Sequence, residues 1–173
     1  MNVGRSCLAT CLLALASMFA CDDEARSEGP GGGEPTLDAG GACPEGQVRC
    51  GGCIDAIAPE AAALQTRVFS RSCALSDACH LGPAAQEGLS LVSLDDLFEG
   101  DRGRRSRQAP ALPLIEPGDP AASYLVRKLR GVDLGKQSGT GAPSTAMPPP
   151  PSPALCEAKI VAIERWIRAG APR

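Results

Sequence analysis

The sequence has few aromatic residues, a single histidine and little net charge. Aromatic residues make up 3% of the 173 residues, so we expect a thin hydrophobic core that needs cross-links or a bound prosthetic group. The formal net charge of −3 is too small to indicate a nucleic-acid partner. No nucleophile–base pair, phosphate-binding loop or carboxylate pair stands out, so the sequence gives no support to a hydrolase or a transferase.

The sequence also lacks an apolar stretch long enough to span a bilayer. The longest one, Cys7–Ala20, follows the positively charged segment Met1–Arg5 and has the length and layout of an export signal. It ends at Cys21, which acidic residues follow, as in bacterial lipoprotein signals. We predict that residues 1–20 are a signal peptide and that Cys21 carries a lipid, which anchors the protein to a membrane outside the cytoplasm. Plain secretion with Cys21 as a thiol is the alternative.

Nine cysteines are present, and their meaning follows from the predicted export. Cys7 and Cys11 belong to the signal and Cys21 to the lipid anchor, which leaves six. An even number outside the cytoplasm indicates disulfides. A zinc site fits less well, because the five-residue gap between Cys73 and Cys79 is wrong for a pair of zinc ligands. The sequence leaves the pairing open among four disulfide candidates: Cys43, Cys50, Cys53 and Cys156.

The mature chain divides into three parts by composition. Residues 21–42 are rich in Gly, Pro and Glu and are expected to form a flexible tether. Residues 43–58 are a turn-rich cysteine loop, and residues 59–173 are expected to form the domain proper. Its apolar spacing, prolines and glycines predict an all-α fold. The helices are expected at residues 59–70, 93–99, 120–130 and 153–169.

The chemistry-bearing stretch contains Cys73, Cys79 and the only histidine, His80. Two thiols just ahead of a histidine are what covalent haem attachment uses, because the sulfurs form thioethers and the imidazole binds iron. Five residues separate the cysteines here, whereas the usual haem-attachment motif has about two residues between them. Ser76-Asp77 is polar and turn-forming, so the extra residues are expected to bulge outward.

A candidate second iron ligand is Met147, the only methionine of the predicted mature chain. Methionines that fill cores usually lie on apolar stripes, whereas four prolines follow this one. A stiff proline run restricts the loop and would hold a soft sulfur in place. An imidazole paired with a thioether raises the reduction potential of haem iron and suits electron transfer.

These features together resemble the cytochrome c family, in particular the divergent cytochrome c-like domains of bacterial surface lipoproteins. The resemblance covers about residues 61–172. Four phrases carry it: Val68–Cys73, Pro117–Pro120 with Ser123–Leu129, Met147–Pro149, and Ile163–Ala171.

The resemblance implies a cytochrome c-like helical fold that holds a haem c group. Thioethers would come from Cys73 and Cys79, and the axial iron ligands would be His80 and Met147. The function it implies is transfer of single electrons by a membrane-anchored protein, rather than enzyme catalysis. The partner would be a redox protein that docks near the basic segment Arg102–Arg107, although a solvated loop is the simpler interpretation of that segment.

Two other interpretations remain open at this stage. In the first, Cys73 and Cys79 form a disulfide in a haem-free, disulfide-stapled surface module with a structural or partner-binding role. In the second, haem is bound but Met147 is not a ligand, which leaves the iron open for small ligands or peroxidase-like chemistry.

Overall fold

The computed structural model describes residues 41–98 and 104–173. The predicted signal peptide, the lipidation site Cys21 and most of the predicted tether lie outside these residues. Within the described ranges, no helix is both long enough and apolar enough to cross a membrane.

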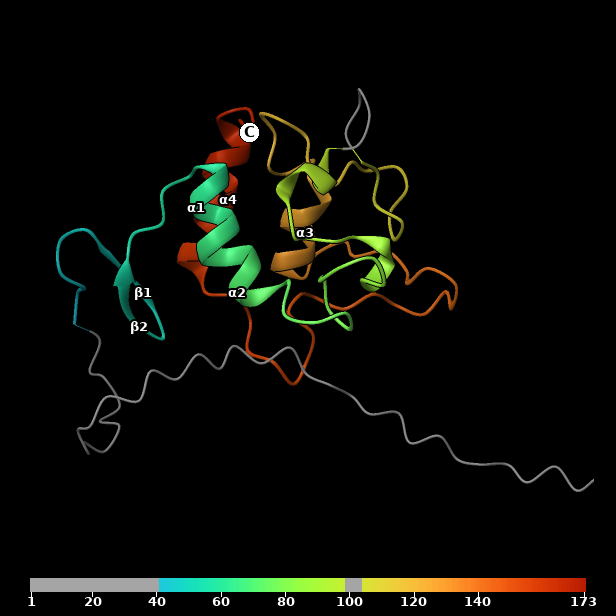
Figure 1. Ribbon diagram of the computed structural model, residues 1–173, viewed down its shortest axis with the longest axis horizontal. Coiled ribbons are helices and arrows are strands. Elements are labelled where there is room, and N and C mark those ends of the chain that lie inside the picture. The colour runs from blue at the N-terminus through green and yellow to red at the C-terminus, as the bar shows by residue number, and fades with distance from the viewer. Residues whose placement is uncertain (1–40, 99–103) are drawn as a thin grey trace, which may run out of the picture.

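The cysteine-rich loop contains a β-hairpin, which the sequence analysis did not predict. Strand β1 (Gln47–Cys50) pairs antiparallel with strand β2 (Gly52–Asp55), and Cys50 lies opposite Gly52. Gly51 makes the turn between them with a φ of +79°, a conformation that glycine adopts without steric cost. The hairpin forms a two-stranded sheet at one side of the molecule (Figure 1).

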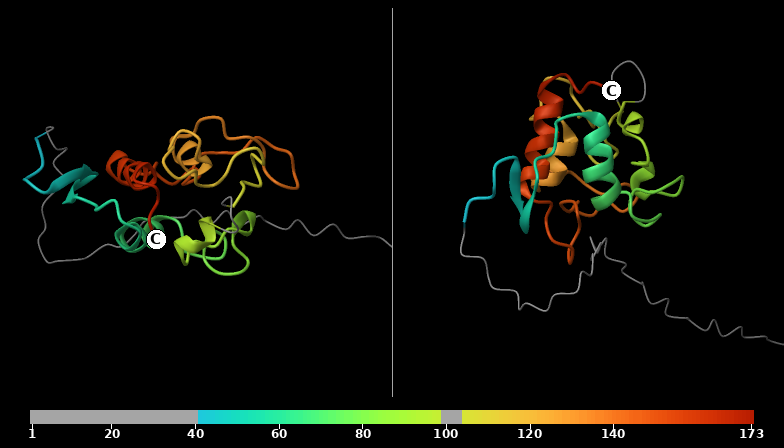
Figure 2. Two further views of the ribbon diagram at one scale, coloured as in Figure 1. Left: turned by 90° about the horizontal axis from the view of Figure 1, so that it is seen from above. Right: turned by 60° about the vertical axis from the view of Figure 1, so that its left-hand side comes forward.

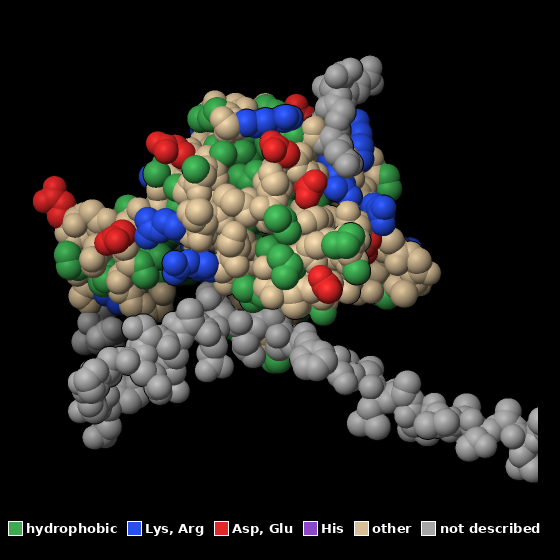
Figure 3. All heavy atoms as spheres, viewed as in Figure 1, with side chains coloured by type: hydrophobic (Ala, Val, Ile, Leu, Met, Phe, Trp, Pro, Cys, Tyr) green, Lys and Arg blue, Asp and Glu red, His purple; other side chains and the backbone are tan. Residues whose placement is uncertain are grey.

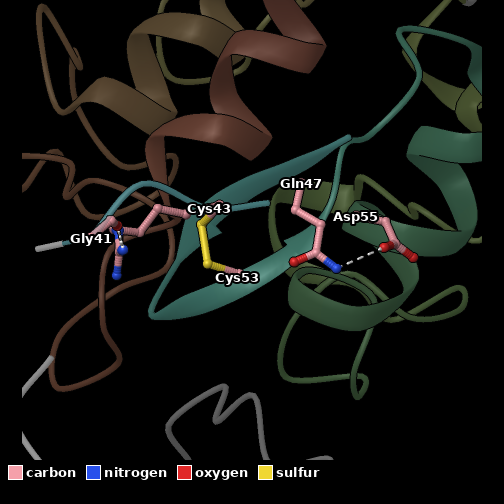
Figure 4. Close-up of a disulfide and its surroundings, with 6 residues drawn as sticks. Gly41, Cys43, Gln47, Cys53 and Asp55 are labelled. Carbon is pink, nitrogen blue, oxygen red and sulfur yellow. Dashed lines mark hydrogen bonds between the residues drawn. A yellow bond between two sulfur atoms is a disulfide. The ribbon is translucent and has the colours of Figure 1, made fainter. Parts of the chain in front are cut away.

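Two disulfides stabilise the hairpin and answer the pairing question for the four candidate cysteines. Cys43 is bonded to Cys53 across the hairpin, close to the hydrogen bond between the Gln47 and Asp55 side chains (Figure 4). Cys50 is bonded to Cys156, 106 residues further along the chain. The second bond joins the hairpin directly to the start of the C-terminal helix.

The helices are short and lie between long loops. A continuous helical run forms near the predicted 59–70 helix, and its middle is π-helical. The other segments are two 3₁₀ turns and two α-helices. In chain order the elements are α1 (Ala61–Leu64), η1 (Gln65–Phe69), α2 (Ser70–Ser72), η2 (Gln86–Gly88), η3 (Leu94–Leu97), α3 (Tyr124–Arg130) and α4 (Glu157–Arg168).

The prediction of an all-α, cytochrome c-like helical fold is therefore wrong. The hairpin adds a sheet, and the helices are too short and too few to make the described part plainly all-α. Helix α3 begins only at Tyr124, because the Asp119 carboxylate holds the backbone N–H groups of Ala121 and Ala122 in a turn. Helix α4 begins at Glu157, after an extended Cys156, rather than at Pro153.

Helix α4 is the centre of the packing. It contacts α1, α3 and β1. Figure 1 shows it behind the α1–α2 run, and Figure 2 shows the two side by side. Its buried face includes Ile163, Trp166 and Ile167, all of which are 0% exposed. The Trp166 indole meets the ring of Phe98 edge-on, with centroids 5.8 Å apart, and donates a hydrogen bond to the carbonyl of Pro172. The indole is thus a fully buried part of the core, together with aliphatic residues of the same helix.

We expect loss of the long-range disulfide to destabilise the protein more than loss of the hairpin disulfide. The double variant Cys50→Ser/Cys156→Ser should lose about 2–5 kcal/mol of unfolding free energy, because an open cross-link restores entropy to the unfolded chain. The closed loops span 106 and 10 residues, and the entropy lost on closure rises with loop length. Urea unfolding followed by Trp166 fluorescence measures the unfolding free energy of each double variant. An equal or larger loss of unfolding free energy in Cys43→Ser/Cys53→Ser would contradict the expectation.

Candidate functional site

The helical run ends directly at Cys73. Helix α2 ends at Ser72, and the backbone of Cys73 leaves the helical conformation with φ −131° and ψ −45°. The amides of Cys73 and Ala74 both donate to the carbonyl of Phe69, a fully buried core residue. The position of Cys73 is therefore set by the core rather than by the loop that follows it.

Residues 74–79 form a loop whose two ends lie side by side. The amide of His80 donates to the carbonyl of Cys73 at 3.1 Å, which closes the loop. Inside it, the carbonyl of Ser76 accepts from the amides of Cys79 and Leu81, so the turn predicted at Ser76-Asp77 is present. The long spacing between the cysteines thus does not separate Cys73 from His80.

The His80 ring has a fixed orientation. Its Nδ1 lies 2.9 Å from the carbonyl oxygen of Leu89, and because a carbonyl only accepts, Nδ1 carries the proton. In the neutral ring this leaves the lone pair on Nε2. Burial lowers the pKa of His80 below its ordinary value of 6.5, partly opposed by the bond to Leu89. The ring is therefore a neutral imidazole with an available nitrogen, which is the form that binds metals.

Met147 lies on the same side of the molecule as His80, on the loop that connects α3 to α4. Its amide donates to the carbonyl of Lys128 at 3.0 Å, which ties the loop to α3. Its side chain is partly buried against the hydrophobic core. The proline run after it leads to the Cys50–Cys156 disulfide, so both ends of this segment are held.

One hollow brings these side chains together. It is open to solvent at its mouth, and its accessible lining is almost entirely apolar. Cys73, His80 and Met147 all line it. A second hollow is lined by the same three residues and by Cys79. The remaining apolar wall of the first comes from Leu89, Leu91, Leu114, Leu125 and Leu129.

The two cysteines of the motif differ in their surroundings. Cys73 is partly exposed, packs against the core and lines both hollows. Cys79 is 5% exposed and disulfide-bonded, and its sulfur accepts a hydrogen bond from the Ser76 hydroxyl at 3.5 Å. A thioether at Cys79 therefore requires that its sulfur first be reduced.

The sequence analysis missed a polar network on the wall of the first hollow. Lys128, Gln108 and Tyr124 form its centre, and Glu87 and Ser144 extend it. Lys128 lies among the apolar positions of α3 and is only 8% exposed. One sequence feature could have indicated this network, namely a lysine within an apolar helical stripe. Lysine is rarely buried without a hydrogen-bonding or charged partner.

The arginines predicted to form a docking patch contact the protein's own backbone. Arg104 donates to the carbonyls of Asp96 and Gly88, and Arg105 donates to the carbonyl of Ala111. Both side chains also line the first hollow together with Arg107. Arg102 lies outside the described residues. Figure 3 shows basic side chains gathered toward the upper right of one face.

Among residues 41–98 and 104–173, no group of three or more His, Cys, Asp and Glu residues could hold a metal ion. A metal site made of these side chains alone is therefore not present in those ranges. Methionine is not one of these four residue types. The pair of His80 nitrogen and Met147 sulfur is a donor set typical of haem iron, which the porphyrin already holds.

We expect the protein to lose stability as the pH falls below 6.5, the ordinary pKa of histidine. The folded state holds His80 at a lowered pKa, so the unfolded chain takes up the proton more readily. Urea midpoints at about pH 7.5 and about pH 5 should differ less in His80→Gln than in the wild type. An equal pH dependence in the two proteins would show that His80 does not contribute.

No protein-family model, no curated protein and no solved structure matches this chain. No relative therefore assigns a family to the chain or a role to these side chains.

Proposed function

We propose that the protein binds haem covalently outside the cytoplasm, on a lipid anchor, and passes single electrons. The observation that carries the proposal is the His80 ring, whose Nδ1 is hydrogen-bonded to Leu89 and whose Nε2 is left as a ligand nitrogen in an apolar hollow that Met147 also lines. Export, Cys21 lipidation and a redox partner protein belong to the same proposal.

The donor set fits the group. His80 would bind iron through Nε2, and the carbonyl of Leu89 would fix the ring plane and make the imidazole a stronger donor. Met147 would supply a soft sulfur from the opposite loop. Haem iron supplies one-electron chemistry by changing its oxidation state, and a histidine–methionine pair raises its potential.

The remaining residues provide a dry surrounding and an attachment point. Leu91, Leu114 and Leu125 form an apolar wall that keeps water away from the ligands, which favours a high potential. Cys73 is the better placed thiol, because the core fixes its backbone and its side chain lines both hollows. Cys79 would form the second thioether only after reduction of its disulfide.

A haem-free, disulfide-stapled surface module is the second candidate. The disulfides of the hairpin and of Cys79 favour it, since they account for cysteines without any cofactor. Such a module would have a structural or partner-binding role.

Production of the mature protein in a host that attaches haem to exported proteins separates the two. We expect the intact mass of a covalent haem adduct and a strong visible absorption band, because Cys73 and His80 lie beside each other at the hollow. In Cys73→Ser the adduct should be lost or much reduced, while the control Cys53→Ser, on the hairpin, should keep it. A colourless wild-type protein with its cysteines in disulfides would support the haem-free module instead.

Replacement of Met147 tests the second axial ligand. Met147→Ala should convert low-spin, six-coordinate iron to a high-spin form and lower the midpoint potential, because the sulfur ligand is lost. The matched control is Val132→Ala, on the same loop, whose side chain is 50% exposed. An unchanged spectrum would remove Met147 from the site and favour an iron open to small ligands or peroxidase-like chemistry.

A further inference from the structure

Lys128 is a buried cation whose hydrogen bonds, among the described residues, go to neutral oxygen atoms. It lies on α3, is 8% exposed and lines the first hollow. Its ammonium donates to the Gln108 side-chain oxygen at 2.8 Å and to the Ser144 hydroxyl. Within the described ranges neither contact is to a carboxylate. Burial lowers the pKa of Lys128, and the charge of Glu87, on the far side of Gln108, opposes this only in part. An ammonium has three protons, and these contacts use two of them.

The Gln108 side-chain oxygen, which accepts from Lys128, is within hydrogen-bond distance of more donors than it can serve. The Gln108 oxygen Oε1 accepts from Tyr124 at 2.8 Å, from Lys128 at 2.8 Å and from Ser144 at 2.8 Å. An amide oxygen has two lone pairs, so three donors exceed its capacity. Besides Gln108, the Tyr124 hydroxyl can donate to the carbonyl of Leu134, and the Lys128 ammonium can donate to the Ser144 hydroxyl. The cluster therefore has donor capacity left for an additional acceptor in the hollow.

Among the described residues, cationic side chains outnumber carboxylates on the lining of the hollow. Four cationic side chains line it, together with the carboxylate of Glu87, whose Oε2 is buried without a hydrogen bond. Burial raises the pKa of Glu87, but hydrogen bonds from Ser138 and Gln108 outweigh it and leave the pKa lowered, so Glu87 is ionised at neutral pH. Its Oε1 is used by Gln108 and Ser138, and Gln108 separates it from Lys128. The four cationic residues are Arg104, Arg105, Arg107 and Lys128.

We propose that Lys128 binds a carboxylate group of an apolar ligand that occupies the hollow. The ligand class is an amphipathic acid, with a hydrophobic body against the leucine wall and a carboxylate at the Lys128 end. Such a carboxylate could belong to a porphyrin or to a fatty acid, and the porphyrin rests on the proposed function. Binding would give the Lys128 ammonium a carboxylate in direct contact, which the described side chains do not supply.

Iron-free protoporphyrin IX tests this without involving the iron ligands. The mature protein is produced outside the cytoplasm in a host without haem-attachment machinery, and porphyrin binding is followed by fluorescence. The dimethyl ester of the same porphyrin, in the same detergent, has the same apolar body without charge. Dodecanoate is the third probe, used as a competitor. The variants are Lys128→Met, Lys128→Arg and the control Lys136→Met, which removes an exposed lysine.

We expect the wild type to bind the diacid at least about tenfold more tightly than the ester, and Lys128→Met to abolish that difference. Lys128→Arg should keep most of it, and Lys136→Met all of it. Displacement of the porphyrin by equimolar dodecanoate would assign the carboxylate to a fatty acid and still support the subsite. Equal binding of diacid and ester by the wild type, no binding of either, or an unchanged preference in Lys128→Met would overturn the proposal.

Failure of this proposal and failure of the proposed function are distinguishable. His80→Ala should leave the Lys128-dependent preference intact, because the probe has no iron. A colourless protein that still prefers the diacid would reject the electron-transfer function and keep the carboxylate subsite. A covalent haem adduct together with equal binding of diacid and ester would support haem binding and reject the carboxylate subsite.

Discussion

The Cys50–Cys156 disulfide is the constraint on which the arrangement depends. The helices are short, and helices of this length are not stable by themselves in water. The bond joins the hairpin to the first turn of α4, and α4 is the helix against which α1, α3 and β1 pack. It also ends the loop that carries Met147. One covalent bond therefore holds both the core helix and one wall of the candidate site.

Backbone hydrogen bonds, rather than regular secondary structure, position the site. The amide of His80 binds the carbonyl of Cys73, and the carbonyl of His80 accepts from Leu91. On the opposite loop the amide of Met147 binds the carbonyl of Lys128 on α3. Each chemistry-bearing loop is thus tied to a packed element within a few residues of its functional side chain. Loops held in this way can carry function while the helices supply rigidity.

The candidate site was more predictable from the sequence than the fold. His80 and Met147, the only histidine and the only methionine of the predicted mature chain, are rare residues, and the structure places them with Cys73 on one hollow. The hairpin was missed because Gly51-Gly52 was interpreted as loop composition, although a glycine turn between two alternating segments also favours a hairpin. Helix starts were placed too early, at Pro120 and Pro153. At the first, Asp119 holds a turn instead, and the second precedes an extended Cys156.

The disulfide pairing and the polar network could not be predicted, for a common reason. Both join residues far apart in the chain, such as Cys50 with Cys156 or Gln108 with Ser144, and no local pattern records such contacts. A sequence indicates what a residue can do but not which distant residue meets it. Lys128 is an example. Its place in an apolar stripe indicates that it is buried, but does not indicate that Gln108 and Ser144 accept its hydrogen bonds.

The energetics of the hollow bear on the choice between a cofactor site and a stapled module. Burying a lysine without a carboxylate costs free energy, and so does leaving an apolar lining with a gap inside a small protein. A module that needed only stability would gain by filling the hollow and replacing Lys128 with methionine. A ligand with an apolar body against the leucines and an acidic end for Lys128 would offset both costs at once. The disulfides are compatible with either function, whereas the apolar hollow and the buried Lys128 favour the proposal that a ligand binds there.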